Sequence, residues 1–250
     1  MIDGISQRLL DQAHPLRIHL LGVAGSGMSG IAALLLEMGH DVSGSDRVTS
    51  GEIERLQGLG LKFSSPHSAA AVSGVDAVVY SSAIKPDNVA LVEARRIEVP
   101  CLRRAECLSA ILHTRKGVLV AGTHGKTTTS AMCAHVLNNA GAAVSHYVGA
   151  EIPVLGANAH WDEGSEYLVA EGDESDGTLD LYRPAYAVVL NIEEEHLDYY
   201  KGLQQIVGVF RTLLEQTSGK AIYCREDSTA YELCSQYEGG LSYGWSDADY

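Results

Sequence analysis

The chain has 250 residues, of which 46% are hydrophobic and 20% are charged, and its formal net charge is −14. This length fits one large or two medium domains with the composition of a soluble globular protein. The acidity argues against nucleic acid as a partner, because no basic field is present to displace counterions. No apolar run reaches the roughly 18 residues of a membrane-spanning helix. The N-terminus lacks the pattern of a secretory signal, so we expect a cytoplasmic protein without a membrane partner.

The first half of the chain alternates short apolar runs with helical segments. The expected strands are 17–21, 41–45, 61–63 and 77–81, and the expected helices are 25–38, 51–59, 89–95 and 104–112. Strands that alternate with helices form right-handed crossovers, which produce a parallel, doubly wound sheet. We therefore expect a Rossmann-like α/β domain over residues 1–115.

A glycine-rich turn, GVAGSGMSG, follows the first expected strand and runs from Gly22 to Gly30. From Gly25 onward it matches Gly-x-Gly-x-x-Gly, and Asp46 closes the next strand at the distance expected for an acidic contact to ribose. We interpret the turn as a site for a phosphate-bearing ligand. Two alternatives remain, namely a nicotinamide or flavin cofactor, and glycines that only helix–sheet packing requires.

The most informative stretch is VLVAGTHGKTTTS at 118–130, an apolar strand that leads through a glycine-threonine turn into a helix expected at 126–139. Amides of such a loop and the positive end of the helix can cradle phosphate. Lys126 can reach the terminal phosphates of a nucleotide, and the Thr127 hydroxyl can hold Mg²⁺. The loop departs from the general Gly-x-x-x-x-Gly-Lys-[Ser/Thr] pattern, which requires glycine at the position of Val120. The alternative is a surface turn with an exposed lysine.

A polar joint at 113–117 separates the two glycine-rich turns. Beyond it we expect further strands at 143–146, 167–170, 185–191 and 221–223, and helices at 203–216 and 227–237. These elements predict a second α/β domain, of the P-loop ATPase type, over residues 116–250. We expect the sheet of this domain to be incomplete at the C-terminus.

Acidic residues follow two strands of the second half, in the segments EGDESDG at 171–177 and NIEEEHLD at 191–198. In open α/β sheets ligands bind beyond the carboxyl ends of the strands, so Glu171 should project near the Lys126 loop. Carboxylate oxygens suit Mg²⁺, and His196 is a candidate second ligand. The alternatives are a solvated acidic face and a structural histidine.

Five segments, in this order and spacing, resemble the Mur ligases: GVAGSGMSGIA, SSAIKPDN, AGTHGKTTT, EGDESDGT and NIEEEHLDYY. The resemblance runs from about Arg17 to Tyr243. It implies a UDP-sugar domain, a central ATPase domain and a third, amino-acid-binding domain, of which this chain carries the first and most of the second.

The resemblance also implies roles for individual residues. The UDP pyrophosphate would face Gly25, Ser26, Gly27 and Met28, and the uridine and sugar would lie near Asp46, Ser81 and Ser82. ATP would be held by Gly122, Thr123, His124, Gly125, Lys126, Thr127 and Thr128. Mg²⁺ would be held by Thr127, Glu171 and His196. Lys126, Glu171 and His196 would act in catalysis.

The activity implied by the resemblance is an ATP-dependent carboxylate–amine ligation in peptidoglycan precursor synthesis. It would join L-alanine to the lactyl carboxylate of UDP-N-acetylmuramic acid through an acyl phosphate. The segment 203–216 contains no lysine, which agrees with the alanine-adding branch and argues against a carbamate bridge. Open alternatives are a murein-peptide recycling ligase, a nicotinamide-dependent oxidoreductase and a non-catalytic nucleotide-binding fragment. Without the third domain, we expect the 250-residue chain alone to be inactive.

Overall fold

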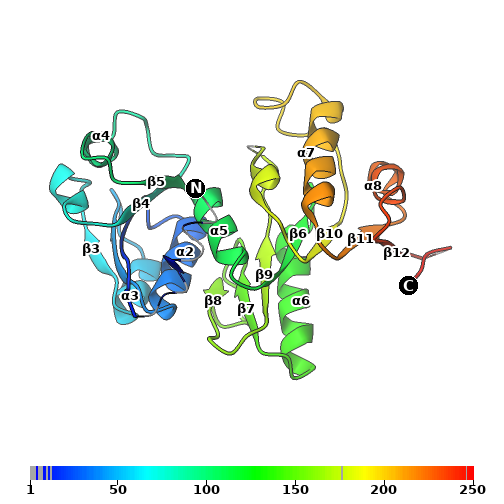
Figure 1. The fold of residues 1–250 in the computed structure, drawn as a ribbon, viewed down its shortest axis with the longest axis horizontal. Coiled ribbons are helices and arrows are strands. Elements are labelled where there is room, and N and C mark those ends of the chain that lie inside the picture. Colours follow the sequence, from blue (N-terminus) through cyan, green and yellow to red (C-terminus); the bar gives the residue numbers. More distant parts are fainter. Residues whose placement is uncertain (1–3, 5–7, 10, 12, 176, 246) are drawn as a thin grey trace. The chain divides into compact units, whose positions relative to one another are not determined.

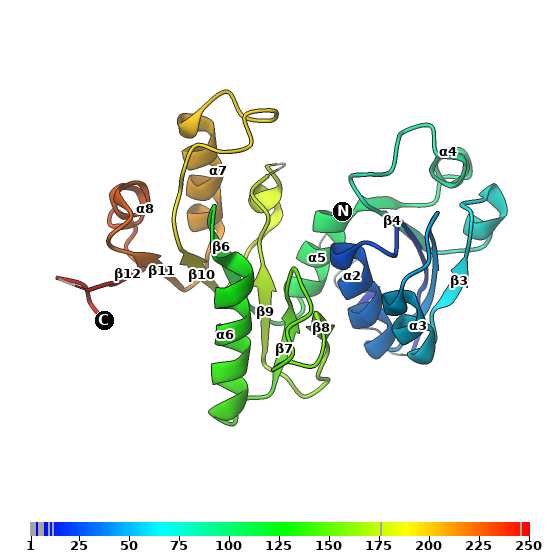
Figure 2. The same cartoon turned by 180° about the vertical axis from the view of Figure 1, so that it is seen from behind.

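The computed structural model describes residues 4, 8–9, 11, 13–175, 177–245 and 247–250 (Figures 1 and 2). The chain divides into two compact units, Met1–Thr114 with Gly149–Gly164, and Arg115–Val148 with Ser165–Tyr250. Residues 149–164, which the sequence analysis assigned to the second domain, group with the first unit. Among the described residues, no helix combines the length and the apolar composition needed to cross a membrane.

The first unit contains a parallel sheet of five strands in the order β3-β2-β1-β4-β5. Its strands are β1 (Arg17–Leu21), β2 (Asp41–Ser45), β3 (Lys62–Ser64), β4 (Ala77–Tyr80) and β5 (Cys101–Arg103). Ile18 of β1 lies opposite Val42 on one side and Ala77 on the other. The strand order reverses at β1, so the carboxyl ends of β1 and β4 form the topological switch point of the sheet. The predicted doubly wound parallel sheet is confirmed.

In the described part of the first unit, four α-helices between and after these strands were predicted from the sequence, whereas one short 3₁₀ turn was not. They are α2 (Ser26–Glu37), α3 (Gly51–Gly58), α4 (Val89–Arg96), α5 (Arg104–Leu112) and the short 3₁₀ turn η1 (Ala69–Val72). Helix α2 is apolar over most of its length and buries every residue from Met28 to Leu35. It begins directly after the glycine-rich turn, so packing of α2 fixes the position of that turn.

The second unit contains a second parallel sheet, whose strands follow the order β12-β11-β10-β6-β9-β7. They are β6 (Lys116–Ala121), β7 (Val144–Tyr147), β9 (Tyr167–Glu171), β10 (Tyr186–Val189), β11 (Lys220–Cys224) and β12 (Gly240–Tyr243). The two-residue β8 (Ala159–His160) lies in the segment that groups with the first unit, where it contacts α2. Strand β6 lies between β9 and β10, with Val120 opposite Glu171 and Ala121 opposite Val189.

The helices of the second unit are α6 (Lys126–Asn139), α7 (Leu203–Gln216), α8 (Ser228–Cys234) and the 3₁₀ turn η2 (Thr178–Leu181). The α6 crossover leads from β6 toward β7, whereas the α7 and α8 crossovers lead the other way, toward β11 and β12. Right-handed crossovers in opposite directions place their helices on opposite faces of a sheet. The loops after β6, β9 and β10 therefore meet at one edge, between the two helical layers.

An apolar hollow of about 710 Å³ lies beside α6 in the second unit. Val118, Val188 and Ile222 line it from the sheet, and Met132 and Val136 line it from the helix. The two helical side chains are about 60% exposed. Apolar side chains of α6 are thus exposed to solvent beside this hollow.

Candidate functional site

The loop that follows β6 is tightly held against the chain that follows β10. Gly122 has a φ of +150°, and a Cβ there would lie 2.9 Å from the Leu190 Cβ and 3.2 Å from the Asn191 amide nitrogen. Residues that carry a side chain rarely adopt this backbone conformation, and no side chain would fit the space beside Leu190 and Asn191. Glycine at this position is therefore required by both the backbone and the packing.

We expect Gly122→Ala to lower the free energy of unfolding by about 2–5 kcal/mol, from backbone strain together with overpacking against Leu190. Thermal or urea unfolding measures this loss. Gly141→Ala is a matched control, because Gly141 also has a positive φ but no atom lies within 4 Å of its added Cβ. An equal loss in the two variants would contradict the role of the Leu190 contact.

Asn191 fastens the loop through three hydrogen bonds. The Thr123 amide donates to its backbone oxygen at 3.1 Å, the His124 amide donates to its Oδ1 at 2.7 Å, and its Nδ2 donates to the His124 oxygen at 3.1 Å. The Glu193 amide donates to the Thr123 hydroxyl at 2.9 Å. The amides of Thr123 and His124, which we expected to face a nucleotide, are thus occupied within the protein.

The amides that remain for an anion lie at the start of α6. Gly125 is the N-cap, with a φ of +82°, no side-chain cap and no acidic residue in the following turn. The first helical hydrogen bond runs from the Thr129 amide to the Gly125 oxygen at 3.0 Å. The amides of Lys126, Thr127 and Thr128 precede it and have no acceptor within the helix. With the helix dipole they form a site suited to phosphate.

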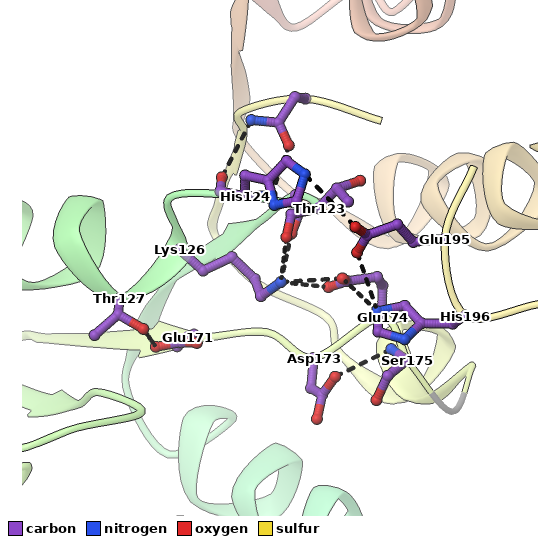
Figure 3. A network of polar contacts seen from close by, with 12 residues as sticks. Thr123, His124, Lys126, Thr127, Glu171, Asp173, Glu174, Ser175, Glu195 and His196 are labelled. Atoms are coloured by element: carbon purple, nitrogen blue, oxygen red, sulfur yellow. Dashed lines mark hydrogen bonds and ion pairs between the residues drawn. The ribbon is translucent and has the colours of Figure 1, made fainter. Parts of the chain in front are cut away.

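Lys126 folds back over this loop toward a buried carboxylate (Figure 3). Its ammonium group donates to the Gly122 oxygen at 2.6 Å, the Thr123 oxygen at 3.1 Å and Glu174 Oε1 at 3.0 Å. The Lys126 side chain is 16% exposed and the Glu174 side chain only 2%. The alternative of an exposed surface lysine is therefore wrong.

Glu174 also joins Lys126 to His196. His196 Nε2 lies 3.3 Å from Glu174 Oε1, and the Tyr200 hydroxyl donates to the Glu174 backbone oxygen. The second oxygen, Oε2, lies 2.9 Å from the Lys126 nitrogen as an ion-pair partner but accepts no aligned hydrogen bond. Lys126 and His196 thus both hold the buried carboxylate of Glu174 in position.

The predicted metal ligands divide into two groups in this structure. The Thr127 hydroxyl donates to Glu171 Oε2 at 3.0 Å, whereas His196 contacts Glu174 (Figure 3). Across the described part of the chain, no three His, Cys, Asp or Glu side chains gather as a metal cluster. Magnesium is commonly held by one or two protein oxygens together with water and phosphate. The hydroxyl and carboxylate of Thr127 and Glu171 fit that ion.

Part of the acidic stretch also faces this site. His124 Nε2 lies 3.6 Å from Glu195 Oε1 and 3.8 Å from Glu193 Oε2, and these side chains are all substantially exposed.

Asp176, which belongs to the predicted acidic motif, lies outside the described residues. Glu174 and Asn191 were not predicted from the sequence as site residues. The available signal was their place within EGDESDGT and NIEEEHLDYY, directly after two strands.

A second candidate site is a cavity of about 730 Å³ in the first unit, at the carboxyl ends of β1, β2 and β4. Its lining includes the predicted residues Gly25, Asp46 and Ser81, together with Gly22, His67, Lys85 and Asn88. The predicted residues Ser26, Gly27, Met28 and Ser82 are not part of this lining. Met28 is only 2% exposed and belongs to the core under α2.

Asp46 holds the turn of this cavity in addition to lining it. Its Oδ2 accepts from the Ala24 amide at 2.9 Å, and its Oδ1 accepts from the Arg47 amide at 2.6 Å. The carboxylate therefore ties the glycine-rich turn to the end of β2. A carboxylate oxygen can accept more than one hydrogen bond, so a ligand contact by Asp46 is compatible with this geometry.

Gly25 is a glycine that the folded chain itself does not require. Its φ is −72°, and an added Cβ would have only the Gly22 oxygen within 4 Å, at 3.6 Å. It caps α2 without a side-chain hydrogen bond, and no acidic residue follows in the first turn. The space left by the missing side chain lies on the cavity wall. This is the geometry of a turn that an anionic group can approach closely.

Comparison with known proteins gives one consistent result for both units. The family described as "Mur ligase family, catalytic domain" matches residues 17–116, and "Mur ligase middle domain" matches residues 120–247. The UDP-N-acetylmuramate–L-alanine ligase of Pelotomaculum thermopropionicum is 42% identical over 223 residues, which are 88% of this chain and 48% of that protein. The chain thus spans about half the length of the curated relatives it matches.

Two solved structures have the same fold. The UDP-N-acetylmuramate-alanine ligase of Thermotoga maritima matches with a TM-score of 0.82 and 29% identity, over 93% of this chain and 53% of that one. The UDP-N-acetylmuramate:L-alanyl-gamma-D-glutamyl-meso-diaminopimelate ligase of Neisseria meningitides matches with a TM-score of 0.85 and 26% identity, over 94% and 80%. With both family descriptions matched in order along nearly all of its length, the chain belongs to the Mur ligase family.

Proposed function

We propose that this chain supplies the UDP-sugar-binding and ATP-binding parts of an enzyme that joins L-alanine to the lactyl carboxylate of UDP-N-acetylmuramic acid. The names of its relatives support this assignment. The observation that carries it is the position of Lys126 at the start of α6, where Glu174 and two loop carbonyls hold its ammonium group. An ammonium group held there is suited to the phosphates of ATP.

In this proposal residues 116–250 bind ATP. The amides of Lys126, Thr127 and Thr128 donate to the phosphate oxygens, and the ammonium group of Lys126 moves its hydrogen bonds from Gly122 and Thr123 to the terminal phosphates. Thr127 and Glu171 hold Mg²⁺, with His196 as a further candidate, and the ion when bound neutralises charge on the transferring phosphoryl group. Glu174 keeps Lys126 oriented throughout.

Residues 1–115 bind the UDP-sugar in the first unit's cavity. The pyrophosphate would lie against the open wall at Gly25 and the start of α2, with Ser26, Gly27 and Met28 contributing backbone rather than side-chain atoms. Asp46, Ser81 and Ser82 would lie toward the uridine and sugar. Binding of this non-reacting part of the substrate can hold the lactyl carboxylate in line for reaction.

The proposed chemistry has two steps. A lactyl carboxylate oxygen attacks the γ-phosphorus of ATP, which forms an acyl phosphate and releases ADP. The amine of L-alanine then attacks the acyl carbon, and phosphate leaves from the tetrahedral intermediate. Phosphorylation is needed because an unmodified carboxylate has no good leaving group. We place this reaction in the cytoplasm as part of peptidoglycan precursor synthesis.

The test is a product assay with the full-length protein, ATP, Mg²⁺ and UDP-N-acetylmuramic acid, read by mass spectrometry. We expect UDP-N-acetylmuramoyl-alanine with L-alanine as the amine. The structural match to the Neisseria meningitides ligase favours one alternative, a murein-peptide recycling enzyme that takes the tripeptide instead. Product with the tripeptide alone would select that alternative. Thermal protection by NAD but not by a UDP-sugar would favour the oxidoreductase and contradict both.

We expect Gly25→Val to weaken the binding of UDP to this chain at least about tenfold, because the added methyl groups enter the space available to the pyrophosphate. Stability should fall by no more than about 1 kcal/mol, since the site is open and the substitution only weakens an N-cap. Isothermal titration with UDP measures the affinity. Gly51→Val is the control, since nothing lies within 4 Å of that glycine at the start of α3. Normal UDP binding by Gly25→Val would contradict the placement of the pyrophosphate.

A further inference from the structure

Two histidines of the first unit are connected through a single serine at the wall of the cavity. His19 lies in β1 and is 1% exposed, Ser45 ends β2 and is fully buried, and His67 follows β3 and lines the cavity. His19 Nε2 lies 3.0 Å from the Ser45 Oγ, which lies 2.8 Å from His67 Nδ1. A continuous path of hydrogen bonds therefore leads from the core to the ligand cavity.

The direction of these hydrogen bonds follows from counting hydrogens. A serine hydroxyl has one hydrogen, so Ser45 donates to one histidine and accepts from the other. At the inner end, the Ser43 Oγ lies 2.8 Å from His19 Nδ1 and donates to the Ile18 oxygen at 3.5 Å. We assign the Ser43 hydrogen to this carbonyl, so that Ser43 accepts from the Nδ1–H group of His19.

The protonation of the two rings completes the assignment. Burial lowers the pKa of His19 to about 4, so this ring is neutral near pH 7 and its Nε2 carries no hydrogen. Ser45 consequently donates to His19 Nε2 and accepts from His67 Nδ1–H. Burial also lowers the pKa of His67, and Arg47 lowers it further, although Asp46 opposes the shift. Neutral His67 then presents a bare Nε2, which has no partner among the described residues.

We propose that His67 accepts a hydrogen bond through Nε2 from an N–H or O–H group of the nucleoside bound in the first unit's cavity. Ser45 and His19 act as positioning residues that hold His67 in this accepting form. The inference rests on the proposed function, in which the ligand is a UDP-sugar. The uracil N3–H and the ribose hydroxyls are the donors of the nucleoside part of that ligand. On the same wall, both carboxylate oxygens of Asp46 already accept backbone amides, whereas His67 Nε2 has no partner among the described residues.

The first experiment examines the positioning role without a ligand. Proton–nitrogen correlation spectra of ¹⁵N-labelled protein at mildly alkaline pH report which ring nitrogen of His67 carries the hydrogen. We expect the hydrogen on Nδ1 in the unmodified chain, a shift toward Nε2–H in Ser45→Ala, and a return to Nδ1–H in Ser45→Thr, which keeps the hydroxyl. A hydrogen on Nε2 of His67 in the unmodified chain, or no change in Ser45→Ala, would overturn the positioning role.

The second experiment examines the ligand contact with UDP as the probe. Loss of one hydrogen bond predicts about fivefold to tenfold weaker binding to His67→Ala, and a similar loss for Ser45→Ala. Titrations with 2′-deoxy-UDP and N3-methyl-UDP then identify the donor. The analogue that lacks the correct donor should bind the unmodified chain more weakly, yet lose little further affinity with His67→Ala. If His67→Ala weakens the binding of both analogues as much as it weakens the binding of UDP, the contact would be overturned.

The outcomes separate this inference from the proposed function. Failure of the unmodified chain to bind UDP would contradict both the UDP-sugar assignment and the nucleoside contact, while the ring spectra would still decide the positioning role. Normal UDP binding by the unmodified chain and by His67→Ala would contradict the inference alone. Thermal unfolding of each variant shows whether a loss of binding comes from a loss of folded protein.

Discussion

Replacing Lys126 by alanine is expected to abolish the stabilisation of this chain by ATP and Mg²⁺. The ammonium group is held against the loop that leads into α6, and each charge-assisted hydrogen bond to phosphate contributes about 1.5–3 kcal/mol. Loss of two such bonds, about 3–6 kcal/mol, corresponds to at least about 100-fold weaker nucleotide binding, since 1.4 kcal/mol is tenfold. Isothermal titration of ATP against both proteins measures the difference. Unchanged affinity would remove Lys126 from the nucleotide site.

The structure adds a cost to stability that the sequence did not suggest. Lys126 pairs with Glu174, which is 2% exposed, so its removal leaves a buried carboxylate without its main cation. Breaking a buried ion pair in this way costs about 3–5 kcal/mol, and His196 at 3.3 Å offsets part of that loss. The double variant Lys126→Ala/Glu174→Gln should regain stability without regaining ATP binding.

A matched control for Lys126 lies at the start of the strand that leads into its loop. Lys116 begins β6 and pairs with Glu166, but both side chains are more than half exposed. Exposed ion pairs contribute about 0–1 kcal/mol to the free energy of unfolding, so Lys116→Ala should change stability little. Because Lys116 lies at the opposite end of β6 from the nucleotide loop, ATP affinity should also stay nearly unchanged. A comparable loss of ATP affinity in Lys116→Ala would indicate a general charge effect rather than a specific phosphate contact.

Replacing Glu171 by glutamine is expected to remove most of the Mg²⁺-dependent part of ATP binding and to leave Mg²⁺-free binding nearly unchanged. The amide keeps the size of the side chain but lacks the negative charge that draws the ion to the Thr127 hydroxyl. Mutations of residues that only support metal ligands already lower metal affinity about 10–100-fold. Loss of a ligand itself should therefore reduce the increase in ATP affinity caused by Mg²⁺ at least about tenfold. Titrations of ATP with and without Mg²⁺ measure the ratio.

Two further variants sharpen this result. Glu166→Gln makes the same chemical change just before β9 rather than at its end, and it should leave the ratio unaltered. His196→Ala distinguishes metal binding from support of Glu174, because only a ligand of the ion acts through Mg²⁺ alone. If Glu171→Gln weakens ATP binding equally with and without Mg²⁺, the metal assignment at Thr127 and Glu171 is wrong.

The parts of the fold that could be predicted are those with strong local signals. Glycine turns and apolar runs mark where β1, β2, α5, α6 and α7 begin and end, and alternation of strands and helices requires parallel sheets. Because the carboxyl ends of parallel strands share one edge of a sheet, the sequence was enough to predict that Glu171 lies near the Lys126 loop. Its Oε2 accepts from Thr127, the neighbour of that lysine.

The remaining features depend on tertiary structure. Strand β5 has only three residues, too few for an alternating pattern, and it forms because β4 offers an unpaired edge. The segment 149–164 groups with the first unit because Asn158 donates to the Ser26 oxygen and the Trp161 amide donates to Glu37, which no local pattern encodes. Glu174 and Asn191 reach the site only through loop conformations.

The order of strands in the second sheet has a consequence for how the chain acquires its nucleotide loop during synthesis. Strand β6 leaves the ribosome early, but both of its neighbours, β9 and β10, come much later in the sequence. The loop after β6 is fixed mainly by Asn191, which follows β10. Contacts between such distant segments form slowly, because a long loop must close first. The phosphate-binding geometry at Lys126 is therefore a late product of folding, and it cannot form on a nascent chain that has not yet extended past Asn191.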